Sequence, residues 1–127
     1  MALADRVAGA LAAVMPVETT DDGAITVRHD GTVASLRAVT IADGLEMVSL
    51  TQMLAWDLPT GTDLRKNVAA LAHTTMLGTV TMAEQPGGKA DVMLRYNFPA
   101  GGLEDEALQT LVLMVLAGGA AARQALI

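Results

Sequence analysis

Alternation of apolar and polar residues through the middle of the chain constrains its fold more than any other feature. In four segments apolar side chains recur at every second position, which is the period of a half-buried β-strand, and a fifth segment, residues 32–41, is rich in valine, threonine and isoleucine. These predicted strands cover residues 24–28, 32–41, 46–56, 78–84 and 89–98. Between the third and the fourth, residues 64–72 carry apolar residues at helical spacing.

Short turn sequences separate the predicted strands. Asp21-Asp22-Gly23, His29-Asp30-Gly31 and Asp43-Gly44 are typical of tight turns, and Gln85-Pro86-Gly87-Gly88 joins the last two strands. Such turns favour antiparallel hairpins. Residues 3–14 have helical spacing, and three carboxylates at residues 104–106 suit the first turn of a last helix.

These elements predict one α+β domain over residues 1–127, in the order α-β-β-β-α-β-β-α. The sheet is expected to be five-stranded, twisted and antiparallel, with helices packed on it. One of its faces is expected to be the core, and Trp56 is predicted to be a packing anchor there. That face carries Ile25, Val27, Val48, Leu50, Leu54, Trp56, Val80, Met82, Val92, Leu94, Tyr96 and Phe98.

The other face of the predicted sheet is neither apolar enough for a core nor charged enough for plain surface. It carries Met47, Ser49, Thr51, Met53, Thr79, Thr81, Met93, Arg95 and Asn97. Methionine side chains are flexible and repack against varied partners. We predict that Met47, Met53, Met93 and Arg95 contact a protein partner. The alternative is a partly solvated face beneath the middle helix, where methionine side chains fill gaps in the packing.

Composition excludes several classes of partner. The chain has a net charge of −6, which disfavours nucleic acid and anionic membranes. It has no cysteine, which fits a reducing compartment, and its start lacks the basic and apolar regions of a signal peptide. We therefore expect a cytoplasmic protein. The longest apolar run, residues 111–122, is shorter than the roughly 20 residues of a membrane span.

Residues that carry catalytic or metal chemistry are sparse. His29 and Asp30 with Asp21 and Asp22 form a conceivable metal cluster, but their spacing matches no calcium loop. No motif surrounds His73, and Gly87-Gly88-Lys89 lacks the rest of a phosphate loop. We expect no enzyme activity, cofactor or metal. A cleft that brought together His29, Asp30 and Asp57 would argue for an enzyme.

The last helix is apolar on all sides over residues 111–117. A surface helix normally has a polar side, so this one is expected either to be sandwiched or to meet a second chain. Gly118 and Gly119 follow, where a kink or a close approach is expected.

The element order resembles the type III secretion chaperone and YbjN-like superfamily. The resemblance rests on the helix at residues 3–14, the hairpin at His29-Asp30-Gly31, the long third strand, the pair at residues 78–84 and 91–98, and the stretch 102–108. Ala69-Ala70-Leu71-Ala72-His73 stands where the chaperones carry Leu-Leu-x-x-Asn, which favours the YbjN-like branch. The resemblance implies a helix-packed antiparallel sheet and non-enzymatic binding of extended polypeptide by strand addition and apolar pockets.

The resemblance also implies homodimers formed through the middle helix and the neighbouring strand. In this sequence the corresponding residues are Leu71, Met76, Leu77 and Val80. We therefore predict a cytoplasmic, homodimeric, chaperone-like module that binds protein or peptide. The alternative is a small regulatory or scaffold domain with a roadblock-like layout, which has two strands before its middle helix.

Overall fold

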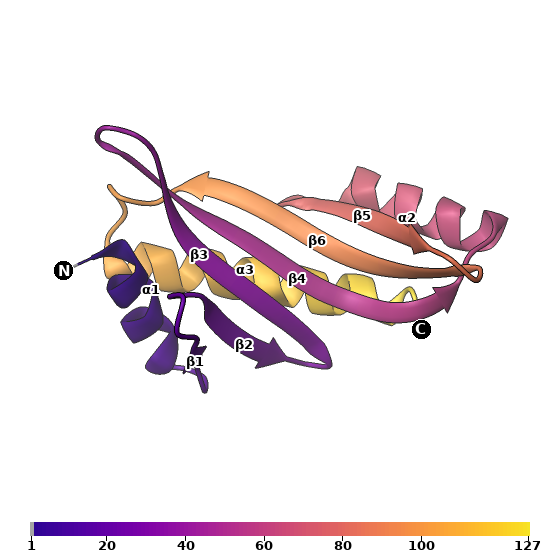
Figure 1. Cartoon of the computed structure of the whole chain (residues 1–127), viewed down its shortest axis with the longest axis horizontal. Coiled ribbons are helices and arrows are strands. Elements are labelled where there is room, and N and C mark those ends of the chain that lie inside the picture. Colours follow the sequence, from indigo (N-terminus) through magenta and orange to yellow (C-terminus); the bar gives the residue numbers. More distant parts are fainter. Residues whose placement is uncertain (1) are drawn as a thin grey trace.

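A computed structural model describes residues 2–127 as one antiparallel sheet with helices on one side (Figure 1). The helices are α1 (Leu3–Ala12), α2 (Thr62–Thr74) and α3 (Asp105–Gln124). The strands are β1 (Glu18–Thr19), β2 (Ile25–His29), β3 (Thr32–Ala42), β4 (Leu45–Pro59), β5 (Thr79–Gln85) and β6 (Lys89–Pro99). The predicted α+β class and antiparallel sheet are therefore confirmed.

The sheet has six strands in the order β1-β2-β3-β4-β6-β5, so the prediction of five was wrong. The missed strand, β1, contributes only two residues, which pair with Thr26 and Ile25 of β2. A two-residue strand is too short to show alternation in the sequence. The hairpin predicted at His29-Asp30-Gly31 is present. Both of its central residues have positive φ, as a two-residue turn of this kind requires.

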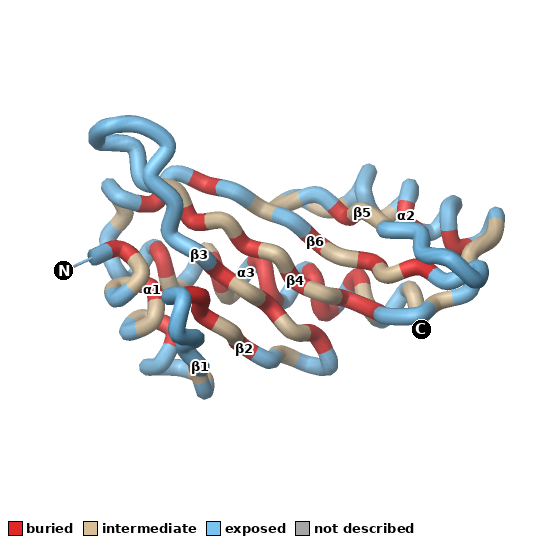
Figure 2. The backbone as a smooth tube through the Cα atoms, in the orientation of Figure 1, coloured by how far each residue is buried: buried red, intermediate tan, exposed pale blue. Residues whose placement is uncertain are grey.

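The hydrophobic core lies between the sheet and the helices (Figure 2). Helix α3 runs behind β2, β3 and β4, and α1 packs beside it. The core side of the sheet contributes side chains that alternate along each strand, as predicted. Its most completely buried members include Ile25, Val27, Leu36, Val48, Leu50, Leu54, Val92 and Leu94.

Helix α2 covers the β5 end of that same side of the sheet. Leu64 and Val68 are its buried residues, and Arg65 forms an ion pair with Glu84 of β5. Glu84 alternates in phase with Val80, which is buried opposite Leu94. The alternative that the Met-rich face lies beneath the middle helix is therefore wrong.

Trp56 does not anchor the core, because 43% of its surface is exposed. The pairing of β4 with β6 shifts register between Met53 and Ala55 and again between Ala55 and Leu58. Asp57 within this irregular stretch has positive φ. The shifts interrupt the strict alternation of the strand, so Trp56 leaves the face on which the regular period placed it.

Helix α3 passes close to β4 at a glycine. The amide of Gln52, fully buried, donates hydrogen bonds to Thr32 Oγ1 at 2.8 Å and to the Leu116 carbonyl at 3.1 Å. A Cβ at residue 119 would stand within 2.6 Å of all three outer atoms of that amide. The helix is continuous through both glycines, so they make no break, and only Gly119 allows the close approach.

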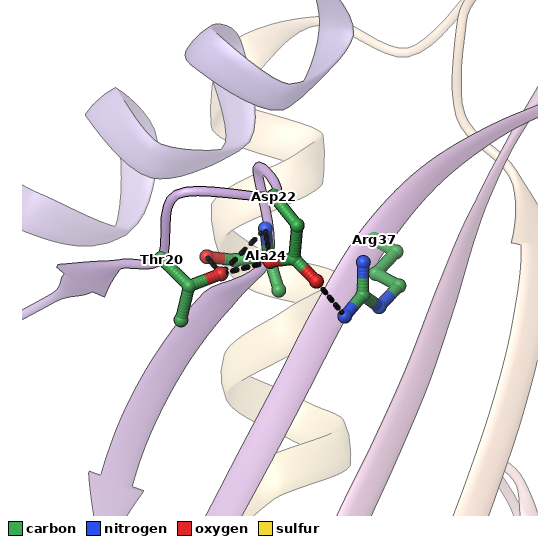
Figure 3. Close-up of polar contacts among 4 residues, drawn as sticks. All are labelled: Thr20, Asp22, Ala24 and Arg37. Atoms are coloured by element: carbon green, nitrogen blue, oxygen red, sulfur yellow. Dashed lines mark hydrogen bonds and ion pairs between the residues drawn. The ribbon is translucent and has the colours of Figure 1, made fainter.

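The turn before β2 is tied to β3 by a carboxylate (Figure 3). Asp22 accepts hydrogen bonds from the Thr20 hydroxyl, from Arg37 Nη2 at 2.7 Å and from the Ala24 amide at 3.4 Å. The Thr20 bond and then the Arg37 guanidinium hold the pKa of Asp22 well below its usual 3.8.

We expect the stability linked to Asp22 to decline as the pH falls below about 5. The folded state holds Asp22 ionised more tightly than the unfolded state does, so acid favours unfolding once the pH approaches 3.8. Thermal unfolding of the wild type and of Asp22→Asn at pH values between about 6 and 2.5 checks this. Between about pH 6 and 2.5, the melting temperature of the Asn variant should fall by less than that of the wild type. Equal losses in the two proteins would contradict the linkage.

Candidate functional site

No helix covers the second side of the sheet in residues 2–127. We call this side the open face and define it by outward-pointing residues of β3, β4, β6 and β5. Cross-strand pairing lines these residues up in rows, because directly opposite residues point to the same side. The open face comprises Val33, Ser35, Arg37, Val39, Ile41, Met47, Ser49, Thr51, Met53, Asp91, Met93, Arg95, Asn97, Thr79, Thr81 and Ala83.

Two apolar rows of the open face lie on either side of two polar rows. Met53 lies opposite Val33 on one side and Met93 on the other, which makes an apolar row. In the next row Thr51 lies between Ser35 and Arg95.

A second apolar pair, Val39 with Met47, lies further along the strands. All four residues predicted to bind a partner are thus on one uncovered face. The three methionines are half-buried among their neighbours, and Arg95 is exposed.

Arg95 differs from every other arginine of the chain. Arg6, Arg28, Arg37 and Arg65 each pair with a carboxylate, and Arg123 donates to the Leu54 carbonyl at 2.6 Å. Within the part of the chain that the structure describes, Arg95 makes no hydrogen bond or ion pair through its side chain. The open face therefore presents an exposed guanidinium that has no partner in the described residues, amid methionine, threonine and asparagine.

The β3–β4 hairpin projects beyond the rest of the sheet (Figure 1). Residues 37–46 are all exposed, and they include Val39, Ile41 and Leu45. At the base of this arm, a hollow of about 270 Å³ is lined by Val39, Ile41, Met47, Ser49 and Asn97. Sequence reasoning found the two strands but missed the projection, because strand alternation does not reveal whether a third strand or a helix lies alongside.

An apolar groove of about 340 Å³ lies on the helical side, between the end of α2 and α3. No charged residue lines it, and the exposed Met114, Gly118 and Ala121 of α3 form one wall. Met76 stands at its rim with 88% of its surface exposed. The lining is Leu71, Thr74, Thr75, Met76, Leu77, Met114, Gly118, Ala121 and Ala122.

Three of the four residues predicted to form a dimer interface line this groove: Leu71, Met76 and Leu77. The fourth, Val80, does not. Only 2% of its surface is exposed, because it packs inside the chain opposite Leu94. A side chain this deeply buried cannot contact a second copy, so Val80 is not part of the proposed interface. Met114, Gly118 and Ala121 were not predicted, although the apolar run in the last helix had pointed to this region.

The structure does not bring His29, Asp30 and Asp57 together in one cleft. His29 Nε2 lies 3.5 Å from Asp30 Oδ2, and both residues line a shallow hollow with three alanines and Gln124. Asp57 does not line that hollow and instead donates its backbone N–H to Asp91. Across residues 2–127, no three His, Cys, Asp or Glu side chains gather as a metal site.

One helix of the described chain, α3, is long and apolar enough to cross a membrane by length and composition alone. This is weak evidence, since the core helix of a soluble protein meets the same criterion. Seven residues of α3 are buried in the fold, including Leu108, Val112 and Leu116.

Comparison with models of known protein families finds no match, and comparison with curated proteins finds none either.

Proposed function

We propose that this chain is a non-enzymatic, chaperone-like module that binds protein or peptide on its open face and acts as a homodimer. The observation that carries the proposal is the uncovered face itself. A sheet side that carries three methionines, two valines and an isoleucine without a covering helix is an unusual surface for a solitary small protein. Flexible methionines on a stable sheet suit a surface that repacks against a partner.

The α2–α3 groove is proposed as the place where a second copy binds. Met76 projects from the rim, while Gly118 and Ala121 leave room within the groove. A projection and a recess on one patch are what a two-fold interface needs, because each copy offers both to the other. The absence of charge from the lining removes the desolvation penalty that charged groups would impose.

The chain exposes 6987 Å², somewhat more than the roughly 6,400 Å² of an average compact monomer of 13.1 kDa, and the projecting β3–β4 hairpin contributes to this area. The dimer proposal therefore rests on the groove. Light scattering over a range of protein concentrations tests the dimer directly.

The fold supports this proposal over the regulatory alternative. A roadblock-like layout has two strands before its middle helix, whereas four strands precede α2 here. The proposed likeness to the YbjN-like branch of the secretion-chaperone superfamily accommodates the observed order of helices and long strands. The proposed compartment is the cytoplasm, on the basis of a chain without cysteine.

We expect Met47→Glu combined with Met93→Glu to abolish partner binding while the fold stays intact. The two carboxylates would lie in the two apolar rows of the open face, where a complex would bury charge in place of apolar side chains, and the one at residue 93 would lie beside Arg95 and compete for its guanidinium. Affinity capture from the native cell extract, with mass spectrometry of the bound proteins, measures the loss against wild type.

The matched control is Ala12→Glu with Val14→Glu. It adds the same charge at exposed positions near the end of α1, away from the open face. Both double variants should keep the circular dichroism spectrum of the wild type. If the Met47/Met93 variant retains the wild-type set of bound proteins, the open face is not the binding surface.

A further inference from the structure

We infer that the open face accepts an amphipathic α-helix of a partner protein, and that a carboxylate on this helix pairs with Arg95. The inference rests on the proposed function and specifies the partner of the same surface. It follows from three features of the face: its backbone, its charge and the spacing of its rows.

The open face offers side chains alone, because the N–H and C=O groups of a strand point sideways within the plane of the sheet. In the central rows, β4 pairs with β3 on one side and with β6 on the other, so these groups are used within the sheet. Strand β5 and residues 37–42 of β3 lie at edges of the sheet, to the side of these rows. An extended peptide lying on this face would meet side chains alone, and its own backbone groups would lose water without replacement. A helix satisfies its backbone internally, so it is the form of polypeptide that such a surface can cover at low cost.

The charge of the face selects an acidic group. The chain has a net charge of −6, yet the central part of the open face carries an arginine without a partner in the described chain. On the same side, Arg28 and Arg37 are already held by Glu18 and Asp22. A second copy placed face to face would bring two Arg95 side chains toward each other. Like-charge repulsion therefore favours a different protein that carries a carboxylate.

The row spacing matches a helix laid along the strands. Residues two apart in a strand lie about 6.8 Å from each other, so the Arg95 row is about one helical turn from the Met53–Met93 row. Met53 lies six positions along β4 from Met47, which is about 20 Å or the length of roughly 13 residues of helix. A helix of three to four turns can thus place apolar residues on both apolar rows and a carboxylate between them.

The test uses four synthetic peptides of about 18 residues, rich in alanine. On one helix face each carries a central variable residue, with one leucine a turn before it and another two to three turns after it. The variable residue is Glu, Gln or Lys, and the fourth peptide has Glu with a proline in mid-helix. Fluorescence anisotropy gives the affinities. The ¹³C-methyl NMR signals of methionine locate the site, since Met47, Met53 and Met93 report on the open face and Met76 and Met114 on the groove.

The Glu peptide should bind roughly tenfold more tightly than the Gln peptide, and the Lys peptide should bind least. Arg95→Gln should remove the preference for Glu, and the control Arg28→Gln should retain it. The signals of Met47, Met53 and Met93 should shift on binding.

The inference is overturned if no peptide binds, if the preference survives in Arg95→Gln, or if only the groove signals shift. Equal binding of the proline peptide also overturns the inference, because the open face would then accept an extended chain as well as a helix. That result would leave the broader proposal of protein binding intact. Failure of the broader proposal is a separate result, namely unchanged capture by the Met47/Met93 variant.

Discussion

Replacing Gly119 by alanine is expected to destabilise the fold by about 3 kcal/mol. The added methyl group would overlap the amide of Gln52, which is fully buried and hydrogen-bonded to β3 and α3. Either the amide must leave both hydrogen bonds or α3 must move away from β4. Urea unfolding followed by circular dichroism measures the loss.

Gly9 gives a matched control for this substitution. A Cβ at Gly9, in the middle of α1 and outside the groove, meets no atom within 4 Å. Alanine there should be neutral or should stabilise by up to about 1 kcal/mol, because alanine is the better helix former. If Gly119→Ala behaves like this control, the contact between α3 and Gln52 is not tight in solution.

A double-mutant cycle separates steric overlap from any other effect of alanine. Gln52→Val shortens the buried side chain and frees the space that the new methyl group needs. We expect the double variant Gln52→Val/Gly119→Ala to be more stable than the sum of the single losses by about 1–2 kcal/mol. Additive losses would mean that the two residues do not interact.

Replacing Met114 by glutamate is expected to convert the proposed dimer to a monomer. Met114 lines the groove and is 54% exposed in the single chain, so the substitution should leave the fold unaffected. In a two-fold interface the charge enters twice, at about 2 kcal/mol for each copy. The dissociation constant should then rise roughly a thousandfold. Sedimentation velocity at several concentrations measures the change.

Thr110→Glu is the control for this substitution. It lies one turn earlier on the exposed side of the same helix but outside the groove, and it adds the same charge. Its dissociation constant should stay within a few-fold of wild type. A dimer that persists in Met114→Glu would show that the two copies meet elsewhere. The projecting arm with Val39, Ile41 and Leu45 would then be the next surface to test.

Local chemistry accounts for the parts of the fold that the sequence predicts well. Asp30-Gly31 defines a turn because both residues must adopt positive φ, and glycine does so without strain. The alternation through residues 48–54 places Val48, Leu50 and Leu54 in the core because each points to the same side of one strand. These signals depend on neighbours within a few residues, so no knowledge of the tertiary structure is needed.

The features that escaped prediction depend on contacts between distant segments. Trp56 points outward because the pairing of β4 with β6 shifts register around Ala55, and no sequence motif near Trp56 predicts that shift. Gln52 stands in the core because Gly119, far along the chain, makes room for its amide. Neither fact can be read from a window of neighbouring residues.

The candidate site also has features that the local sequence predicts and features that depend on distant contacts. Strand alternation was enough to place Met47, Met53, Met93 and Arg95 on one face. It could not tell that α2 would pack on the opposite side and leave them uncovered. It also assigned Val80 to an interface, although Val80 shares the buried face of its own strand pair. That Arg95 has no partner in the described chain depends on where the acidic residues lie in the folded molecule.

The placement of the α2–α3 groove and the open face on opposite sides of one sheet has a consequence for assembly. A dimer joined through the groove would keep both open faces accessible and would therefore be bivalent. Two linked target helices could then bind the same dimer at once, with an avidity up to 10²–10⁴ times that of a single site. Modest affinity at each face would be enough for firm retention of a partner that carries the target segment twice.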